Sequence, residues 1–191
     1  MVLLLTTKHI MGQINLSKVT KELPIFDTII DNCVEINSYL ISLINEEQSN
    51  PDHRNHESNV KAWHTNYLLH HTNRRFKPII DISLNFCQTI STEYFNTDDL
   101  NYKCINFWAM KYTKGNYALR HNHFPSDFSC VYYVDVKEGS SPIIFEDSHV
   151  IYPKNGMLIL FPGYINHDVP PTDSDRTVIS MNISKWLINE G

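Results

Sequence analysis

The first half of the chain spaces its apolar residues as helices do. After Pro24, apolar side chains recur at intervals of three and four residues as far as Ile44, which predicts an amphipathic helix that ends near Glu47. Pro78 is a residue type favoured in the first turn of a helix, and the apolar positions after it predict a second long helix. The polar stretch 50–59 between these helices predicts a surface loop.

After Asn101 the pattern changes to short runs of β-branched and aromatic residues separated by Gly, Pro, Ser and Asp. This sequence pattern predicts an antiparallel sandwich or jelly roll with the N-terminal helices packed on one sheet. The predicted strands are Cys104–Tyr112, Phe128–Asp135, Pro142–Phe145, Met157–Phe161 and Arg176–Ile183. We therefore expect a single domain over 1–191, with a helical support segment over 1–100 and a jelly-roll core over 101–185.

Composition narrows the possible classes of protein. The 191 residues include 16 Lys and Arg against 21 Asp and Glu, a net charge of -5, so we expect no binding to duplex nucleic acid, which needs excess positive charge. The four cysteines form no Cys-x-x-Cys pair, which gives no support to a zinc ribbon or a dithiol redox site and predicts reduced core residues. They are Cys33, Cys87, Cys104 and Cys130.

Neither a secretion signal nor a membrane span is predicted. The apolar run Val2–Leu5 has no basic segment before it and no small-residue cleavage site after it. No apolar stretch approaches the length of about 20 residues that crosses a bilayer. We therefore expect a cytoplasmic protein with no membrane partner.

Three histidines and their contexts indicate a metal site. His121 and His123 are two residues apart in extended chain, so both imidazoles can point the same way. His167 follows an apolar strand and the turn Pro162–Gly163. It would complete a three-ligand set with open positions for substrate and oxygen.

Arg176 adds a second element to this site. It lies nine residues after His167, at the start of a predicted strand. A guanidinium that projects into a barrel needs an anionic partner, and the carboxylate of a ligand would supply two parallel hydrogen bonds.

At these residues the chain resembles the iron(II)- and 2-oxoglutarate-dependent oxygenase superfamily. The resemblance covers roughly residues 104–183 and is closest to the prolyl-hydroxylase-like branch and to phage-type 2-oxoglutarate oxygenases. Tyr112-x-x-Gly115 and the pair Tyr132-Tyr133 also resemble prolyl hydroxylases. The resemblance implies a mainly β fold with flanking N-terminal helices and a double-stranded β-helix, the jelly-roll core also found in cupins. A phage-encoded member would act in the host cytoplasm.

The resemblance also implies roles for individual residues. Iron(II) would be held by His121, His123 and His167, and 2-oxoglutarate, the cosubstrate with O2, would place its far carboxylate on Arg176. The implied cofactor-binding residues are Arg176, Tyr112, Tyr132 and Ser180. The family has an aspartate where this chain has His123, so Asp127 stays open as an alternative second ligand.

The function implied is a dioxygenase that hydroxylates a small molecule or a peptidyl, prolyl-type side chain and releases succinate and CO2. The alternative is a cupin-type dioxygenase, isomerase or ligand-binding protein that does not use 2-oxoglutarate. Gly115-x5-His121-x-His123 matches a cupin motif, but that pattern gives no role to Arg176. A third class is a metal-free interaction domain. The oligomeric state is left open by the sequence.

Most of the other histidines need no metal. His64, His70 and His71 are predicted to lie on a helix face or at the substrate rim, since no partner carboxylate has a known position. His149 is predicted to be a loop residue. The polar or terminal segments contain His9, His53 and His56.

Overall fold

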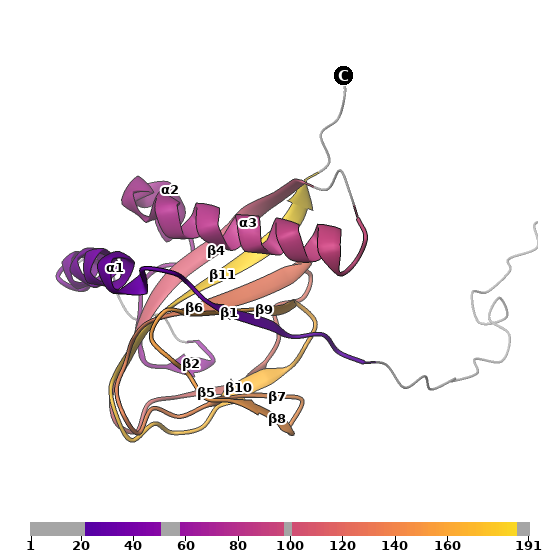
Figure 1. The fold of residues 1–191 in the computed structure, drawn as a ribbon. Helices are drawn as coiled ribbons and strands as arrows, with labels where there is room; N and C mark the ends of the chain where they lie inside the picture. Colours follow the sequence, from indigo (N-terminus) through magenta and orange to yellow (C-terminus); the bar gives the residue numbers. More distant parts are fainter. Residues whose placement is uncertain (1–21, 51–57, 98–100, 187–191) are drawn as a thin grey trace, which may run out of the picture.

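The computed structural model describes residues 22–50, 58–97 and 101–186, and two facing antiparallel sheets form its centre (Figure 1). The larger sheet has the strand order β1 (Phe26–Ile29), β9 (Met157–Pro162), β6 (Phe128–Val136), β11 (Arg176–Trp186), β4 (Asn101–Tyr112) and β3 (Trp63–His64). The smaller sheet has the order β2 (Val60–Lys61), β5 (Tyr117–His121), β10 (His167–Val169), β7 (Ile143–Phe145) and β8 (His149–Ile151).

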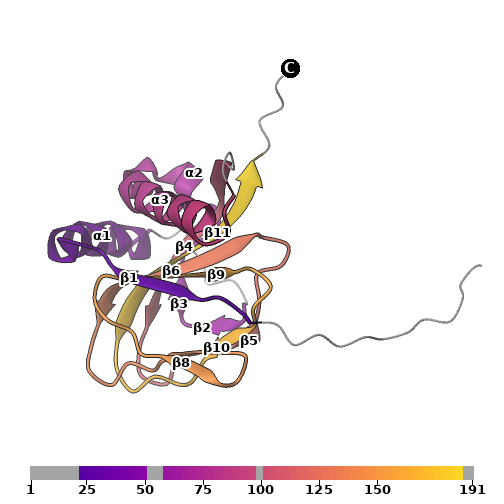
Figure 2. The ribbon, with the colours of Figure 1, turned by 45° about the vertical axis from the view of Figure 1, so that its right-hand side comes forward.

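The helices cover the outer face of the larger sheet (Figure 2). They are α1 (Cys33–Gln48), α2 (Leu69–Thr72), a short 3-10 turn (Arg74–Phe76) and α3 (Lys77–Glu93). The predicted β sandwich with N-terminal helices on one sheet is therefore confirmed. In the described residues no helix is long and apolar enough to cross a membrane.

The larger sheet is buried on both faces, which explains its long apolar strands. On β4, Phe107 and Ala109 face the helices, whereas Trp108, Met110 and Tyr112 face the smaller sheet. The molecule thus has one core between helices and sheet and a second core between the two sheets. The second core surrounds the candidate site.

One predicted helix begins later than expected. Residues Phe26–Ile29 form β1, which pairs antiparallel with β9, and α1 begins only at Cys33. Partly buried and exposed side chains alternate along β1 with the period of a strand, and the pairing with β9 selects this pattern over the helical one. Asn32, with φ 55°, then redirects the chain into the helix. The second helix agrees with its prediction, with Pro78 in its first turn.

The N-terminal half contributes more than helices. Its strands β1 and β3 lie at the two edges of the larger sheet, and β2 lies at one edge of the smaller sheet. The short strands β5, β8 and β10 were also not predicted, and β8 places His149 in a strand instead of a loop. The predicted loop over 50–59 lies largely outside the described residues, as do the run Val2–Leu5, His9, His53 and His56.

The cysteines are free thiols, as predicted. Cys87 and Cys130 are buried, and Cys33 and Cys104 are partly buried. Burial raises the pKa of the Cys104 and Cys130 thiols to about 12, so both stay protonated and unreactive near neutral pH.

Candidate metal and carboxylate site

Three histidines from two neighbouring strands converge on one point. His121 ends β5 and lies directly opposite His167 of β10, and the centroids of these two rings are 4.4 Å apart. The ring of His123 lies 5.1 Å from each of them. One nitrogen from each ring falls within 4.8 Å of the other two, and this is the one cluster of its kind among the described residues. Such a spacing suits a divalent transition metal.

Backbone contacts orient two of these rings. The Nδ1 atom of His121 is 2.7 Å from the carbonyl oxygen of Leu119, and Nδ1 of His167 is 3.2 Å from that of Ile165. A carbonyl oxygen only accepts hydrogen bonds, so each Nδ1 carries the proton and donates it. Each Nε2 then presents its lone pair to a metal.

The three imidazoles are neutral near physiological pH. Burial lowers the pKa of His121, and burial together with the neighbouring His121 lowers that of His123 to about 3. The pKa of His167 is lowered mainly by burial, with further contributions from His121 and His123. Neutral imidazole is the form that binds metal, so the site needs no deprotonation before it takes an ion.

His123 lies beyond the end of β5 and is positioned by the turn after β9. Its backbone N–H donates to the carbonyl oxygen of Gly163 over 2.7 Å. The backbone N–H of Gly163 in turn donates to the backbone carbonyl oxygen of Asp127 over 3.0 Å. A Cβ at position 163 would lie 2.2 Å from the carbonyl oxygen of Ser126. Glycine is therefore required here for the close approach of the two loops.

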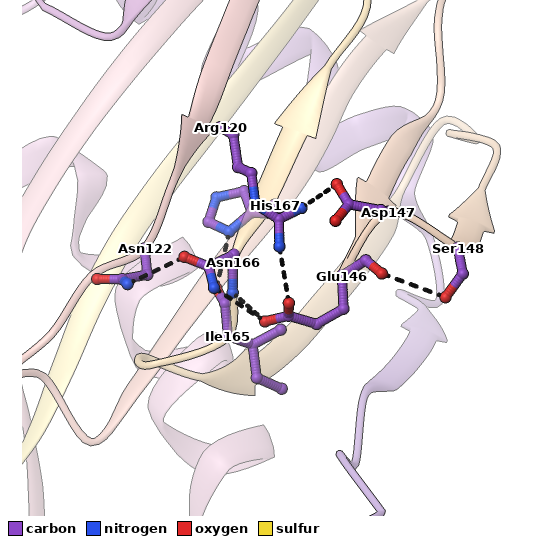
Figure 3. Close-up of polar contacts among 8 residues, drawn as sticks. All are labelled: Arg120, Asn122, Glu146, Asp147, Ser148, Ile165, Asn166 and His167. Carbon is purple, nitrogen blue, oxygen red and sulfur yellow. Dashed lines mark hydrogen bonds and ion pairs between the residues drawn. The ribbon is translucent and has the colours of Figure 1, made fainter.

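A polar network joins the histidine-bearing segments (Figure 3), and its members Arg120, Asn122, Glu146, Asp147 and Asn166 do not line the cavity between the sheets. Asn122 donates to Asn166 over 3.1 Å, and the backbone and side chain of Asn166 both donate to Glu146. Arg120 then pairs with Glu146 and with Asp147. Glu146 and Asp147 both have positive φ angles, 46° and 61°, which L side chains rarely adopt. The ion pairs with Arg120 therefore stabilise a strained turn beside the site.

A cavity between the sheets connects the histidine cluster to Arg176. This arginine is 3% exposed, and its Nη1 donates to the carbonyl oxygen of Ser141 over 2.7 Å. The guanidinium stacks on the ring of Tyr112, 4.2 Å from its centroid. Its buried Nε has no hydrogen-bond partner among the described residues. A buried cation in this state calls for an anion, and a carboxylate would satisfy it.

The register of β4 and β11 places other predicted residues on the cavity wall. Arg176 pairs with Tyr112, and Ser180 pairs with Trp108, with all four side chains on the cavity side. Tyr133 also lines the cavity, and its burial raises the pKa of its phenol to about 12, so it is a neutral hydrogen-bonding group there.

The expected position of Tyr132 at the cofactor pocket is wrong. Its ring lies on the opposite face of β6, in the core beneath the helices, and its hydroxyl donates to Asn37 over 2.6 Å. Adjacent residues of a strand face opposite ways, so one tyrosine of the pair had to point away from the cavity. Tyr133 is the one that faces it, and the sequence signal for it was the same Tyr-Tyr pair.

Asp127 does not join the histidine cluster. Its carboxylate accepts from the backbone N–H of Lys185 over 2.8 Å and pairs with the side chain of Lys185 at 3.7 Å. His123 is the third member of the cluster that could hold an ion, and no aspartate or glutamate lines the cavity among the described residues.

The histidines near Trp63 lie outside the cluster as well. His64 is buried in β3, with Nδ1 2.7 Å from the carbonyl oxygen of Thr65, and is not on a helix. His70 and His71 lie on the short helix α2, with ring centroids 4.0 Å apart. None of the three contributes to a metal cluster in the part of the chain that the structure describes.

Comparison with known proteins identifies the fold. No protein-family model and no curated protein matches the sequence. Among solved structures, a prolyl-4-hydroxylase from Pseudomonas putida superposes with a TM-score of 0.67 at 13% identity, covering 86% of this chain and 94% of that one. At such an identity the likeness is one of fold.

Two further solved structures extend the comparison. The viral collagen prolyl hydroxylase of Paramecium Bursaria Chlorella virus-1, solved as a 2-oxoglutarate complex, has a TM-score of 0.57 at 16% identity and covers 84% of this chain and 96% of its own. A Trichoplax adhaerens prolyl hydroxylase, solved with a hypoxia inducible factor peptide fragment, has a TM-score of 0.56 at 18% identity, with 84% and 83% coverage. The core of this chain is thus the double-stranded β-helix expected from the sequence.

Proposed function

We propose that this protein is an iron(II)- and 2-oxoglutarate-dependent oxygenase of the prolyl-hydroxylase type. The observation that carries the proposal is the presence, in one cavity, of three neutral histidines and a buried arginine without an acidic partner among the described residues. Imidazoles are suitable ligands for iron(II). A guanidinium is suited to the far carboxylate of 2-oxoglutarate. The shared fold with prolyl hydroxylases, one of them solved with 2-oxoglutarate, supports the assignment.

The histidines at one end of the cavity would bind the metal, and Arg176 at the other end would bind the far carboxylate of 2-oxoglutarate. Iron and 2-oxoglutarate, when bound, supply the oxidation itself, in which O2 and 2-oxoglutarate become succinate and CO2 while a C–H bond of the substrate becomes C–OH. At one end, the backbone carbonyls behind His121 and His167 fix the ring orientations. At the other end, Tyr112 and the carbonyl of Ser141 hold the guanidinium of Arg176 ready for an anion.

The walls between these ends are mainly apolar, and the cavity of about 50 Å³ has room for a few water molecules. We expect the bound cosubstrate to displace this water, so that the apolar walls surround the reacting groups.

The substrate side of the proposal is a small molecule or a peptide side chain, as for the Trichoplax enzyme with its peptide. Apolar and aromatic side chains gather near the metal end. Phe124, next to His123, is 76% exposed, and the half-exposed Tyr67 packs against Trp108 of the cavity wall. Exposed aromatic side chains beside a pocket are typical of a recognition surface.

A cupin-type protein that does not use 2-oxoglutarate is not favoured. Such a protein needs the three histidines but has no use for a buried arginine at the far end of the cavity. Arg176 is the discriminating residue, because it is too buried to be a solvated surface cation.

The test is binding and turnover with the purified protein. Fe(II) is added under nitrogen, 2-oxoglutarate is titrated while its charge-transfer absorption is followed, and succinate is measured once air is admitted. We expect the absorption band and slow succinate formation without a prime substrate. If neither is observed, the proposal is overturned.

Two variants separate the two ends of the cavity. Arg176→Gln removes the charge and keeps a polar side chain, and Arg176→Glu reverses the charge. Both are expected to abolish 2-oxoglutarate binding and to leave metal binding intact, as measured by metal analysis. Circular dichroism checks that each variant is folded. Retained 2-oxoglutarate binding in a folded Arg176→Glu protein would contradict the assignment.

A further inference from the structure

The cavity has no negative charge of its own. Its metal ligands would be three neutral imidazoles, and no aspartate or glutamate lines its wall among the described residues. The position next to His121 and His167 that a carboxylate would fill is occupied by His123. Any cation bound here therefore keeps its full charge.

Carboxylates close to the site are used elsewhere or face away. Glu146 and Asp147 pair with Arg120 outside the cavity, and Asp127 pairs with Lys185. Asp168 follows His167 on β10, and its side chain points to the other face of that strand, although its negative charge is close enough to act on His121. None of these carboxylates lines the cavity itself.

A charge count for the loaded site follows from the proposed function, on which this inference rests. A divalent metal and the guanidinium of Arg176 bring three positive charges, and 2-oxoglutarate brings two negative charges. One positive charge is left in a mainly apolar cavity. A buried charge without a partner is unfavourable. An anion that enters the cavity is therefore stabilised by its attraction to this unpaired positive charge.

We propose that the substrate carries a carboxylate group that enters this cavity beside the metal and neutralises the remaining charge. Position 123 is then a specificity-determining residue, since a carboxylate side chain there would remove the charge that attracts the substrate. The carboxylate belongs either to a small organic acid or to an acidic peptide side chain. The chemistry recognised is the same in both cases.

The experiment uses the protein loaded with Co(II), whose visible absorption reports ligands at the metal, and N-oxalylglycine as a stable analogue of 2-oxoglutarate. Acetate and acetamide, which have nearly the same shape and differ in charge, are then titrated separately. We expect acetate to change the spectrum at a concentration at least tenfold lower than acetamide. A capped aspartate residue, N-acetylaspartate amide, in a third titration distinguishes a peptide side chain from a small acid.

His123→Asp is the matched variant, because it restores the carboxylate that the family has at this position. It is expected to weaken acetate binding at least tenfold while N-oxalylglycine still binds. Equal binding of acetate and acetamide by the unaltered protein overturns the inference, whether or not the variant folds. If N-oxalylglycine itself produces no spectral change, the proposed function is overturned as well, so the two failures are distinguishable.

Discussion

Asn122 and Asn166 each lie beside a histidine of the cluster, and the side-chain amide of Asn122 donates to that of Asn166 over 3.1 Å. This bond joins the end of β5 to the start of β10, the two segments that carry the histidines. The carboxylate of Glu146 holds Asn166 in place by accepting two further hydrogen bonds, one from its backbone N–H and one from its side-chain amide. The spacing of the histidines thus depends on a network that does not touch the cavity.

Removal of this network is expected to weaken metal binding. Asn166→Ala loses its side-chain bonds to both Asn122 and Glu146, which join the ligand-bearing segments without contacting the rings. Groups that bond ligands directly typically contribute ten- to a hundredfold to affinity, so we expect an effect at the lower end of that range. We expect the affinity for Co(II) or Zn(II) to fall about tenfold, measured by competition with a chelating dye. Asn122→Ala loses its bond to Asn166 and also the one that it accepts from the backbone N–H of Phe124, next to His123, so it should weaken metal binding to a similar extent. Unchanged affinity in both variants would show that the network does not position the ligands.

Direct removal of a ligand is expected to have a larger effect. His121→Ala and His167→Ala should each abolish binding of a divalent ion, measured by metal analysis after dialysis. His149→Ala, at an exposed position of β8, should bind as the unaltered protein does. Asp127→Asn tests the alternative second ligand, and loss of metal in this variant but not in His123→Ala would contradict the ligand set proposed above.

Gly163 is expected to tolerate no side chain. A methyl group there would lie 2.2 Å from the carbonyl oxygen of Ser126, so Gly163→Ala should reduce the free energy of unfolding by about 1–3 kcal/mol and also displace the loop that holds His123. Gly115→Ala is the control. It has a positive φ of 85° but no neighbour within 4 Å, so it should cost only the backbone strain of about 1–2 kcal/mol and leave metal affinity unchanged. Urea unfolding and metal titration measure the two effects.

His70 is expected to make the protein sensitive to acid. Both of its ring nitrogens are buried without a hydrogen-bond partner among the described residues. Burial, with the adjacent His71, lowers its pKa below the ordinary value of 6.5. The unfolded chain then binds the proton at a higher pH than the folded chain, so stability falls as the pH drops below 6.5 and levels off only below the folded-state pKa.

A leucine at this position tests the expectation. His70→Leu removes an unsatisfied polar group and should raise the free energy of unfolding at pH 7 by about 1 kcal/mol. The difference from the unaltered protein should grow as the pH is lowered from 7 to 5, as followed by thermal unfolding. A constant difference over this range would show that His70 does not titrate differently in the folded and unfolded chains.

The sequence predicted those parts of the fold in which local pattern and burial agree. β4 and β11 are buried on both faces over much of their length, and their apolar, β-branched and aromatic runs predicted these strands although Ser180, Asn182 and Ser184 interrupt β11. β10 has three residues, and its strand character comes from pairing with β5 and β7, which are distant in sequence. Phe26–Ile29 carries both a helical and a strand pattern, and only its pairing with β9 decides between them.

The candidate site was predictable to a similar extent. The order of His121, His123, His167 and Arg176 indicated that they converge, and the structure brings them to one cavity. The choice between Tyr132 and Tyr133 was not available from the sequence, because alternation separates the two faces of a strand without saying which one is the cavity face. Pairing of β6 with β11, including an irregularity after Thr177, sets that phase.

The three edge strands from the N-terminal half have a consequence for any attempt to reduce the protein to its β half. A fragment that starts at Asn101 would lose β1, β2 and β3, leaving open the backbone hydrogen-bonding groups of β9, β5 and β4 that these strands cover. Unprotected edges recruit strands from other molecules, so such a fragment is expected to self-associate. The N-terminal half therefore acts as a guard against aggregation as well as a support for the site.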